Sequence, residues 1–226
     1  MTVIRPRHAS TLIILRRDGQ TTRVLMGERH GRHAFMPNVT VFPGGAVDLV
    51  DHRLPCSFCL PEDSVTRLLD RPRGCTPRGL ALAAIRETFE ETGLRIAHCT
   101  GRSLRSRNRD WAEFNEGGFE PAVDRLAFVA RAITPPGPKR RYDTRFFATT
   151  IDAIAGDPDD FSRASGELGD LSWIDVDDVL SRDIRPVTQR GLRFALKWLN
   201  MPDPERPERP IPFTYMRHGK RVLDKV

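Results

Sequence analysis

Three glutamates at helical spacing are the residues of this sequence that could most directly do chemistry. Glu87, Glu90 and Glu91 stand at i, i+3 and i+4 in RETFEETG, so a helix would present them on one face. Arg86 lies four residues before Glu90, but one guanidinium cannot neutralise three carboxylates. Hard divalent cations such as Mg²⁺ take carboxylate, phosphate and water oxygens as ligands. An ordinary solvated acidic face is the alternative interpretation.

The glutamates fall at the end of a well-marked helix. Thr76 followed by Pro77 is a typical helix start, and Gly93 is a typical stop. On this helix Leu82, Ile85 and Phe89 point away from the glutamates. The sequence therefore predicts a helix over 77–92 with an apolar face toward a core and an acidic face elsewhere.

Strands precede and follow this helix, which predicts an α/β or α+β layered fold. Residues 9–17 and 22–29 favour a hairpin turning at Asp18-Gly19, and the extended piece VTVF leads through Pro43 to Gly44 and Gly45. Further strands are expected at 125–134, 144–151 and about 171–176, and a second long helix at 186–200. We expect one domain over residues 1–200.

Three segments interrupt or extend this pattern. Residues 52–78 are rich in Pro, Cys and Arg and are interpreted as an insertion with a short helix around Val65 to Leu69. Residues 100–120 are predicted to form a basic, polar loop. The proline-rich residues 201–226 are predicted to form an extended C-terminal arm.

Composition limits the classes of function. The 226 residues are 39% hydrophobic and 29% charged, without an apolar run long enough to cross a bilayer, so no membrane span is expected. Leu12 to Leu15, bounded by arginines, favours a strand over a signal peptide. The net charge of +6 permits nucleic-acid binding, but the arginines are scattered among acids and no such motif accompanies them. A solvated basic surface is the preferred interpretation of this charge, and phosphorylated small molecules are the next candidate partners.

The four cysteines suggest reduced thiols and a cytoplasmic location, because a secreted disulfide scaffold is normally shorter and richer in cysteine. Cys56, Cys59 and Cys75, with His52 nearby, form a candidate structural Zn²⁺ site. A single C-x2-C is a weak pattern, so free thiols packing the insertion are the preferred interpretation.

The glycine pair and the glutamates together resemble the Nudix box, G-x5-E-x7-R-E-U-x-E-E-x-G-U, of hydrolases that cut nucleoside diphosphates linked to another group. The second half is in register at Arg86, Glu87, Glu90, Glu91, Gly93 and Leu94. The first half differs in two ways. Asp51 follows Gly45 in place of the glutamate of the motif, and Asp48 is an equal candidate for that position. Thirty-four residues rather than seven separate Asp51 from Arg86. This interrupted box, with VFPGG before it and YDTRFFAT after it, is similar to the branch that includes peroxisomal coenzyme A diphosphatase.

The resemblance implies a Nudix-type α/β/α sandwich with a mixed central sheet. It also implies Mg²⁺-dependent hydrolysis, with Mn²⁺ as a substitute, of a nucleoside diphosphate derivative. Coenzyme A or acyl-CoA, giving 3′,5′-ADP and a phosphopantetheine product, is the favoured substrate. ADP-ribose or dinucleotide polyphosphate hydrolysis, and a non-catalytic nucleotide sensor, are the alternatives. No nucleic-acid or membrane partner is expected, and a homodimer is a candidate assembly.

The same resemblance suggests residue roles. Glu87, Glu90 and Glu91 would be the metal ligands, with a backbone carbonyl of Gly44 or Gly45, and Arg86 would orient the cluster. Either Glu87 or Glu167 is the candidate general base. Arg145, with Arg140 and Arg141, is a candidate ligand for a phosphate of the nucleotide.

Overall fold

A mixed sheet forms the centre of the computed structural model, which describes residues 4–29, 39–69, 74–102, 104, 106–182, 184–202 and 209–226. Its strand order is β10-β2-β1-β8-β7-β11-β12, with β3 paired to β2 and β4 to β1. The β1–β8 and β7–β11 pairs are parallel and the other pairs are antiparallel. The strands are β1 (Arg7–Asp18), β2 (Thr21–Arg29), β3 (Thr40–Val41), β4 (Gly44–Ala46), β7 (Ala127–Ile133), β8 (Tyr142–Thr150), β10 (Leu168–Asp175), β11 (Pro212–Arg217) and β12 (Lys220–Lys225).

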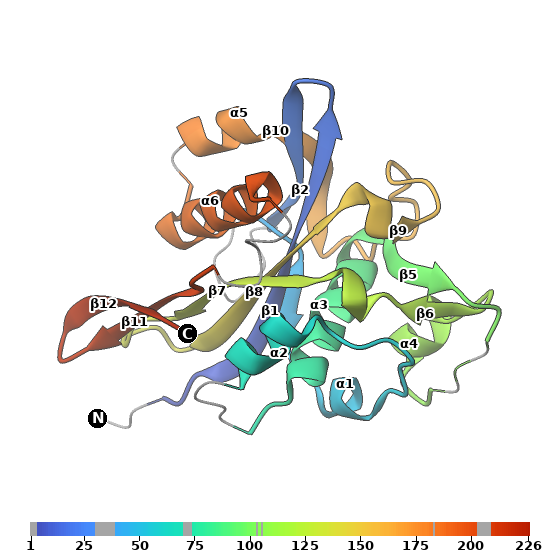
Figure 1. The fold of residues 1–226 in the computed structure, drawn as a ribbon, viewed down its shortest axis with the longest axis horizontal. Helices are drawn as coiled ribbons and strands as arrows, with labels where there is room; N and C mark the ends of the chain where they lie inside the picture. The colour runs from blue at the N-terminus through green and yellow to red at the C-terminus, as the bar shows by residue number, and fades with distance from the viewer. Residues whose placement is uncertain are drawn as a thin grey trace.

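Helices cover both faces of this sheet (Figure 1). Side chains alternate along β1, so Leu12 and Ile14 join the core under α3, while Ile13 and Leu15 join the core under α6. The predicted α/β/α layering with a mixed central sheet is confirmed. The helices are α1 (Leu49–Arg53), α2 (Glu62–Leu68), α3 (Pro77–Thr92), α4 (Arg109–Phe114), α5 (Val176–Ser181) and α6 (Pro186–Asn200), with 3₁₀ turns η1 (Val123–Arg125) and η2 (Ile151–Ala153).

The central helix α3 begins and ends where its caps predict. The Thr76 hydroxyl accepts a hydrogen bond from the Gly79 backbone N–H at 3.0 Å. Gly93 adopts a left-handed conformation with φ of 80°, which a side chain would disfavour, and its N–H donates to the Phe89 carbonyl at 2.8 Å. The predicted strands 125–134 and 144–151 and the helix 186–200 are also confirmed, as β7, β8 and α6.

The insertion packs against the start of α3 instead of leaving the domain. It begins within α1 and contains α2. The short predicted helix begins at Glu62, three residues earlier than expected, and ends at Leu68, one residue earlier. Leu54, Leu60 and Leu68 are buried in the α3 core. Arg78 donates from Nη2 to the Leu54 carbonyl at 3.1 Å, which fixes the end of α1 beside α3.

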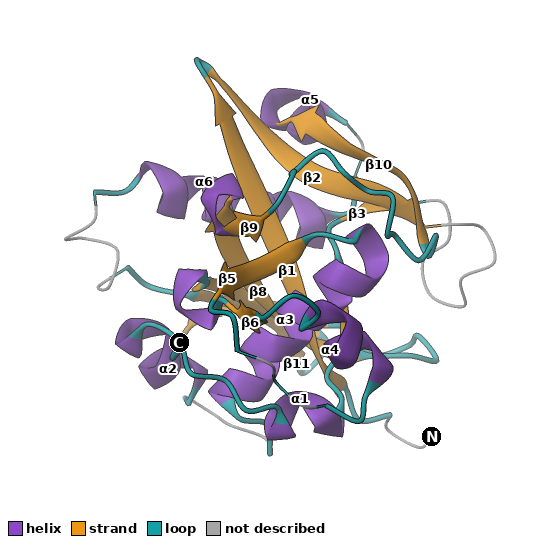
Figure 2. Cartoon of the chain, turned by 90° about the vertical axis from the view of Figure 1, so that its right-hand side faces the viewer, coloured by secondary structure: helices purple, strands orange, loops and turns teal. Residues whose placement is uncertain are grey.

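The loop expected over 100–120 is wrong in part, because it contains α4 and ends at β6 (Phe119–Pro121). The Asn108 side chain caps α4, and Trp111 and Phe114 are fully buried. Strand β6 joins β5 (Arg95–Cys99) and β9 (Ile154–Ala155) in a small sheet beside α3 (Figure 2).

The C-terminal residues have more structure than the predicted arm. Strands β11 and β12 form a hairpin, and β11 runs parallel to β7 at the edge of the central sheet. Among the described residues, no helix is both long and apolar enough to cross a membrane.

Candidate functional site

The glycines of β4 meet the glutamates of α3 at close range. The Gly44 backbone N–H donates to the Glu91 carboxylate at 2.7 Å. A Cβ atom at Gly45 would overlap the Glu87 carboxylate, and a Cβ at Gly44 would lie 2.6 Å from the Thr11 Cα. Both positions therefore need glycine, because a side chain would displace either a glutamate or strand β1.

Arg86 joins the two halves of the interrupted motif. Its Nε and Nη2 donate to the two Asp51 carboxylate oxygens at 2.8 and 3.0 Å. Its Nη1 lies 2.9 Å from Glu87 Oε1 and donates to Glu90 Oε1 at 2.7 Å. Nη2 also donates to the Ala46 carbonyl at 3.0 Å, next to the glycines. One guanidinium thus orients two of the three glutamates.

Of the two candidate acids in the first half of the motif, Asp51 is the one that contacts Arg86. Asp51 is fully buried, whereas Asp48 caps α1. The Asp48 backbone N–H donates to Asp51 Oδ2 at 2.9 Å. Asp51 thus sits where the resemblance places a glutamate, despite the long insertion.

Burial dominates the electrostatics of the glutamates. It raises the pKa of Glu87 to about 7, with Glu90 adding to the rise and Arg86 opposing it. Burial likewise raises the pKa of Glu91 well above its ordinary value, against the opposing Gly44 hydrogen bond. The pKa of Glu90 rises too, through burial and the neighbouring Asp110, although Arg86 opposes the change. The cluster carries more negative charge than Arg86 alone can stabilise.

Glu167 lies on the loop that approaches the end of α3. The Ser165 backbone N–H donates to the Glu90 carbonyl at 3.0 Å, and the Glu167 N–H donates to Ser165 Oγ at 3.3 Å. Glu167 is exposed, and its negative charge contributes to the raised pKa of Glu91. Both predicted base candidates, Glu87 and Glu167, are therefore neighbours of Glu91.

Arg145, the candidate phosphate ligand, is buried beside Asp143 and does not line the cavity near the glycines. It is 2% exposed and points to the α3 face of the sheet. Its Nη1 lies 3.1 Å from Asp143 Oδ1 and 3.1 Å from His8 Nδ1, and burial is the main cause that lowers its pKa to about 10. Because side chains alternate along β8, the neighbouring Thr144 and Phe146 lie on the opposite face of the sheet, where they line that cavity.

The cysteines of the insertion do not converge. Cys75 Sγ lies 3.6 Å from His52 Nε2, but Cys56 donates to the Phe58 and Pro121 carbonyls and Cys59 is exposed. Within the described ranges, no three His, Cys, Asp or Glu side chains are arranged to hold a metal ion. The Zn²⁺ prediction therefore gains no support. In the glutamate cluster, Glu90 is turned to Arg86 and Glu91 to the Gly44 N–H.

Helix α4 adds two residues that the sequence did not assign to the site. Trp111 Nε1 donates to Asp51 Oδ1 at 3.2 Å, and Asp110 lies beside Glu90. The signal was Asn108 as a capping residue, followed by Trp111 and Phe114 at helical spacing.

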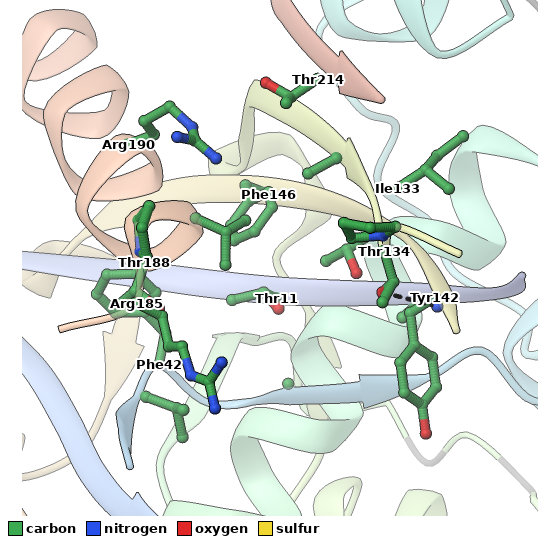
Figure 3. A pocket seen from close by; sticks show the side chains of 18 of the residues that line it. Thr11, Phe42, Ile133, Thr134, Tyr142, Phe146, Arg185, Thr188, Arg190 and Thr214 are labelled. Atoms are coloured by element: carbon green, nitrogen blue, oxygen red, sulfur yellow. Dashed lines mark hydrogen bonds between the residues drawn. The ribbon is translucent and has the colours of Figure 1, made fainter. Parts of the chain in front are cut away.

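A cavity of about 360 Å³ opens on the α6 side of the sheet and extends to the same glycines (Figure 3). Thr11, Thr144 and Phe146 form its floor, and Gly44, Gly45 and Ala46 form one border. The glycine strand therefore lies between this cavity and the glutamates. No acidic side chain of the described chain lines the cavity. Four arginines do, and they are Arg29, Arg185, Arg190 and Arg221.

Comparison with known proteins gives a consistent result. No protein-family model matches the chain. A Caenorhabditis elegans protein named "Putative nudix hydrolase 7" is 27% identical over 180 residues, covering 75% of this chain and 51% of that protein. The chain thus spans about half the length of this relative.

Two solved structures share the fold. A NUDIX hydrolase from Alicyclobacillus acidocaldarius matches with a TM-score of 0.63 and 24% identity, over 85% of this chain and 91% of that one. The NUDIX domain of Shewanella oneidensis NrtR, solved with ADP ribose, matches with a TM-score of 0.50 and 13% identity, over 87% and 90%. The chain is thus similar in sequence to a protein named a nudix hydrolase, and it shares its fold with two solved NUDIX structures.

Proposed function

We propose that this chain hydrolyses the pyrophosphate bond of a nucleoside diphosphate derivative in a divalent-metal-dependent reaction. The observation that carries the proposal is the meeting of Glu87 and Glu91 with the β4 glycines, at the border of an arginine-lined cavity. A phosphate chain lying along β4 would be held between cationic side chains and a carboxylate cluster. That is the arrangement that phosphoryl transfer requires.

The donor set fits a hard divalent cation. Three carboxylates on one helix face supply oxygen ligands, and burial raises the pKa of each, so a bound cation would stabilise their charged forms. We assign Glu87, Glu90 and Glu91 as ligands for Mg²⁺, or for Mn²⁺ in its place, with a carbonyl of Gly44 or Gly45 as a further donor. When bound, the ion would neutralise phosphate oxygens and lower the pKa of water.

The other residues of the site position these groups. Arg86 holds Glu87 and Glu90 by hydrogen bonds or ion pairs while Asp51 anchors its other edge, so Arg86 is a positioning residue. The proton of the attacking water would pass to Glu87 or to Glu167. Both carboxylates lie beside Glu91, and a base must be within hydrogen-bond reach of the water.

Coenzyme A or an acyl-CoA is the substrate that we propose first, giving 3′,5′-ADP and a phosphopantetheine product. The cavity supports a ligand of this kind because its lining combines arginines with apolar side chains such as Phe42, Phe146 and Met216, as an anionic molecule with an aromatic base requires. ADP-ribose is the runner-up, since the similar NrtR domain binds ADP ribose. Dinucleotide polyphosphates and a non-catalytic sensor complete the alternatives.

A substrate panel tests the proposal. Coenzyme A, an acyl-CoA, ADP-ribose and a diadenosine polyphosphate are incubated with the protein in Mg²⁺, in Mn²⁺ and in EDTA, and the products are identified by mass spectrometry. We expect metal-dependent cleavage between the two phosphorus atoms of the pyrophosphate of coenzyme A. Binding of these compounds without turnover in either metal would instead support the sensor.

A further inference from the structure

Two arginines from distant parts of the sequence meet at the cavity without an acidic partner. Arg190 comes from α6 and is half-buried, and Arg221 comes from β12 and is exposed. Burial lowers the pKa of Arg190, and the nearby charge of Arg221 lowers it further. Within the described part of the chain, neither guanidinium has a hydrogen bond or ion pair. Two neighbouring cations without a counter-ion favour an anion between them.

The register of the C-terminal hairpin directs Arg221 toward this cavity. Arg221 is paired directly with Met216 in β11, and Thr214 is paired with Ala132 of β7. Side chains that are paired across strands, or two apart along one strand, lie on the same face of the sheet. Ala132, Thr214, Met216 and Arg221 therefore share a face, and all four line the cavity. The acid of this hairpin, Asp224, pairs with Phe213 on the other face.

Helix α6 places Arg190 on the opposite wall. Gly191, next in sequence, packs against Phe146 of the cavity floor, where a Cβ would lie 3.2 Å from the Phe146 ring. Figure 3 shows Arg185, Thr188 and Arg190 along one side of the cavity, with Phe146 beside them. The first turn of α6 begins at Pro186 without a side-chain cap, so the positive end of the helix dipole adds to the positive potential at this wall.

The arginine pair is separate from the glycine border. From β4 the sheet passes through β1 and β8 to β7 and β11, and α6 packs over β8. Arg221 lies on β12, five strand spacings from β4, whereas Arg190 lies over β8, only two strand spacings or about 10 Å from β4. A nucleotide with its pyrophosphate at β4 and a second phosphate on its ribose can cover much of the span to β8, and the long arginine side chains reach toward it.

We propose that Arg190 and Arg221 form a second anion subsite, which binds a phosphomonoester on the ribose of the substrate, away from the pyrophosphate that is cleaved. The inference rests on the proposed hydrolase function and narrows its substrate class. Substrates with a 2′- or 3′-phosphate are favoured over ADP-ribose and diadenosine polyphosphates, which lack one.

Direct binding tests the subsite without turnover. Calorimetry measures the affinity of the full chain for 3′,5′-ADP, 2′,5′-ADP and AMP, and the two bisphosphates distinguish the position of the extra phosphate. We expect at least one bisphosphate to bind about tenfold more tightly than AMP, as a charge-assisted contact provides. The Arg190→Gln/Arg221→Gln protein should lose this preference and retain its affinity for AMP.

A matched control uses arginines of the same helix and the same β11–β12 hairpin. Arg193 on α6 and Arg217 on β11 are exposed and do not line the cavity, so Arg193→Gln/Arg217→Gln should keep the preference. Equal affinity of the wild-type protein for all three nucleotides, or no measurable binding of any, would overturn the subsite. So would an equal loss in the two double variants. Discrimination in binding together with no hydrolysis would uphold the subsite and refute the hydrolase proposal.

Discussion

Replacing Glu87 with glutamine should stabilise the metal-free protein and weaken its response to Mg²⁺. Burial raises the pKa of Glu87 from its ordinary 4.5 to about 7. The folded state therefore favours the protonated form, and stability is lost as pH rises from about 4.5 through about 7. Glutamine imitates the protonated carboxyl and avoids this loss.

The magnitude follows from the same pKa values. A change of one in pKa is equivalent to about 1.4 kcal/mol. The rise from 4.5 to about 7 sets an upper limit of about 3 kcal/mol at pH 8, and relaxation of the protein reduces the expected gain to about 1 to 2 kcal/mol. At pH 5 the gain should be much smaller, because most of the wild-type carboxyl is then protonated.

Urea unfolding in EDTA at pH 5 and pH 8 measures this difference, and repetition in Mg²⁺ measures the metal response. A ligand at one hundred times its dissociation constant adds about 2.7 kcal/mol to stability, and Glu87→Gln should receive much less than the wild-type protein. Glu116→Gln is the control, since Glu116 is exposed and lies 3.8 Å from Arg163 in a surface pair. A Glu87→Gln protein that is less stable than wild type at pH 8, or equally stabilised by Mg²⁺, would refute the reasoning.

Two further predictions concern the supports of the site. Asp51→Asn should cost about 3 to 5 kcal/mol in urea unfolding, because it removes the buried carboxylate that pairs with Nε and Nη2 of Arg86. Asp48→Asn should cost less than about 1 kcal/mol, because asparagine also caps helices. Similar small losses in both variants would contradict the assignment of Asp51. Thiol titration at pH 8 should show two fast and two slow cysteines. Burial raises the pKa of Cys75 to about 11, so only about 0.1% of it is thiolate at that pH. The fast pair should be Cys59 and Cys99 and the slow pair Cys56 and Cys75. Protection of Cys59 that a chelator relieves would indicate bound zinc instead.

The sequence predicts the parts of the site that depend on local signals. Thr76, Pro77 and Gly93 mark the ends of α3 by hydrogen bonds within a few residues, so the helix that carries the glutamates can be placed before any coordinates. The spacing of the glutamates then fixes their common face. The turn at the glycine pair can also be predicted, because the pair lies between an extended segment and a helix.

Other parts depend on contacts between distant residues. The choice between Asp51 and Asp48 is decided by which carboxylate reaches Arg86, thirty-five residues along the chain from Asp51. Strand β11 pairs with β7, which lies more than eighty residues earlier in the chain, and no local pattern in the proline-rich tail predicts that pairing. The face of β8 on which Arg145 lies likewise depends on strand register, which periodicity alone does not fix.

The most direct test of the account compares wild-type and Glu91→Gln proteins with coenzyme A in Mg²⁺, with products identified by mass spectrometry. Glu91 is 2% exposed and bonded to the Gly44 N–H, and burial raises its pKa. The wild-type protein should form 3′,5′-ADP and phosphopantetheine. Glu91→Gln should be at least about 100-fold slower, without a lower melting temperature in EDTA. Turnover by Glu91→Gln at the wild-type rate would contradict the assignment of the glutamate cluster as the catalytic centre.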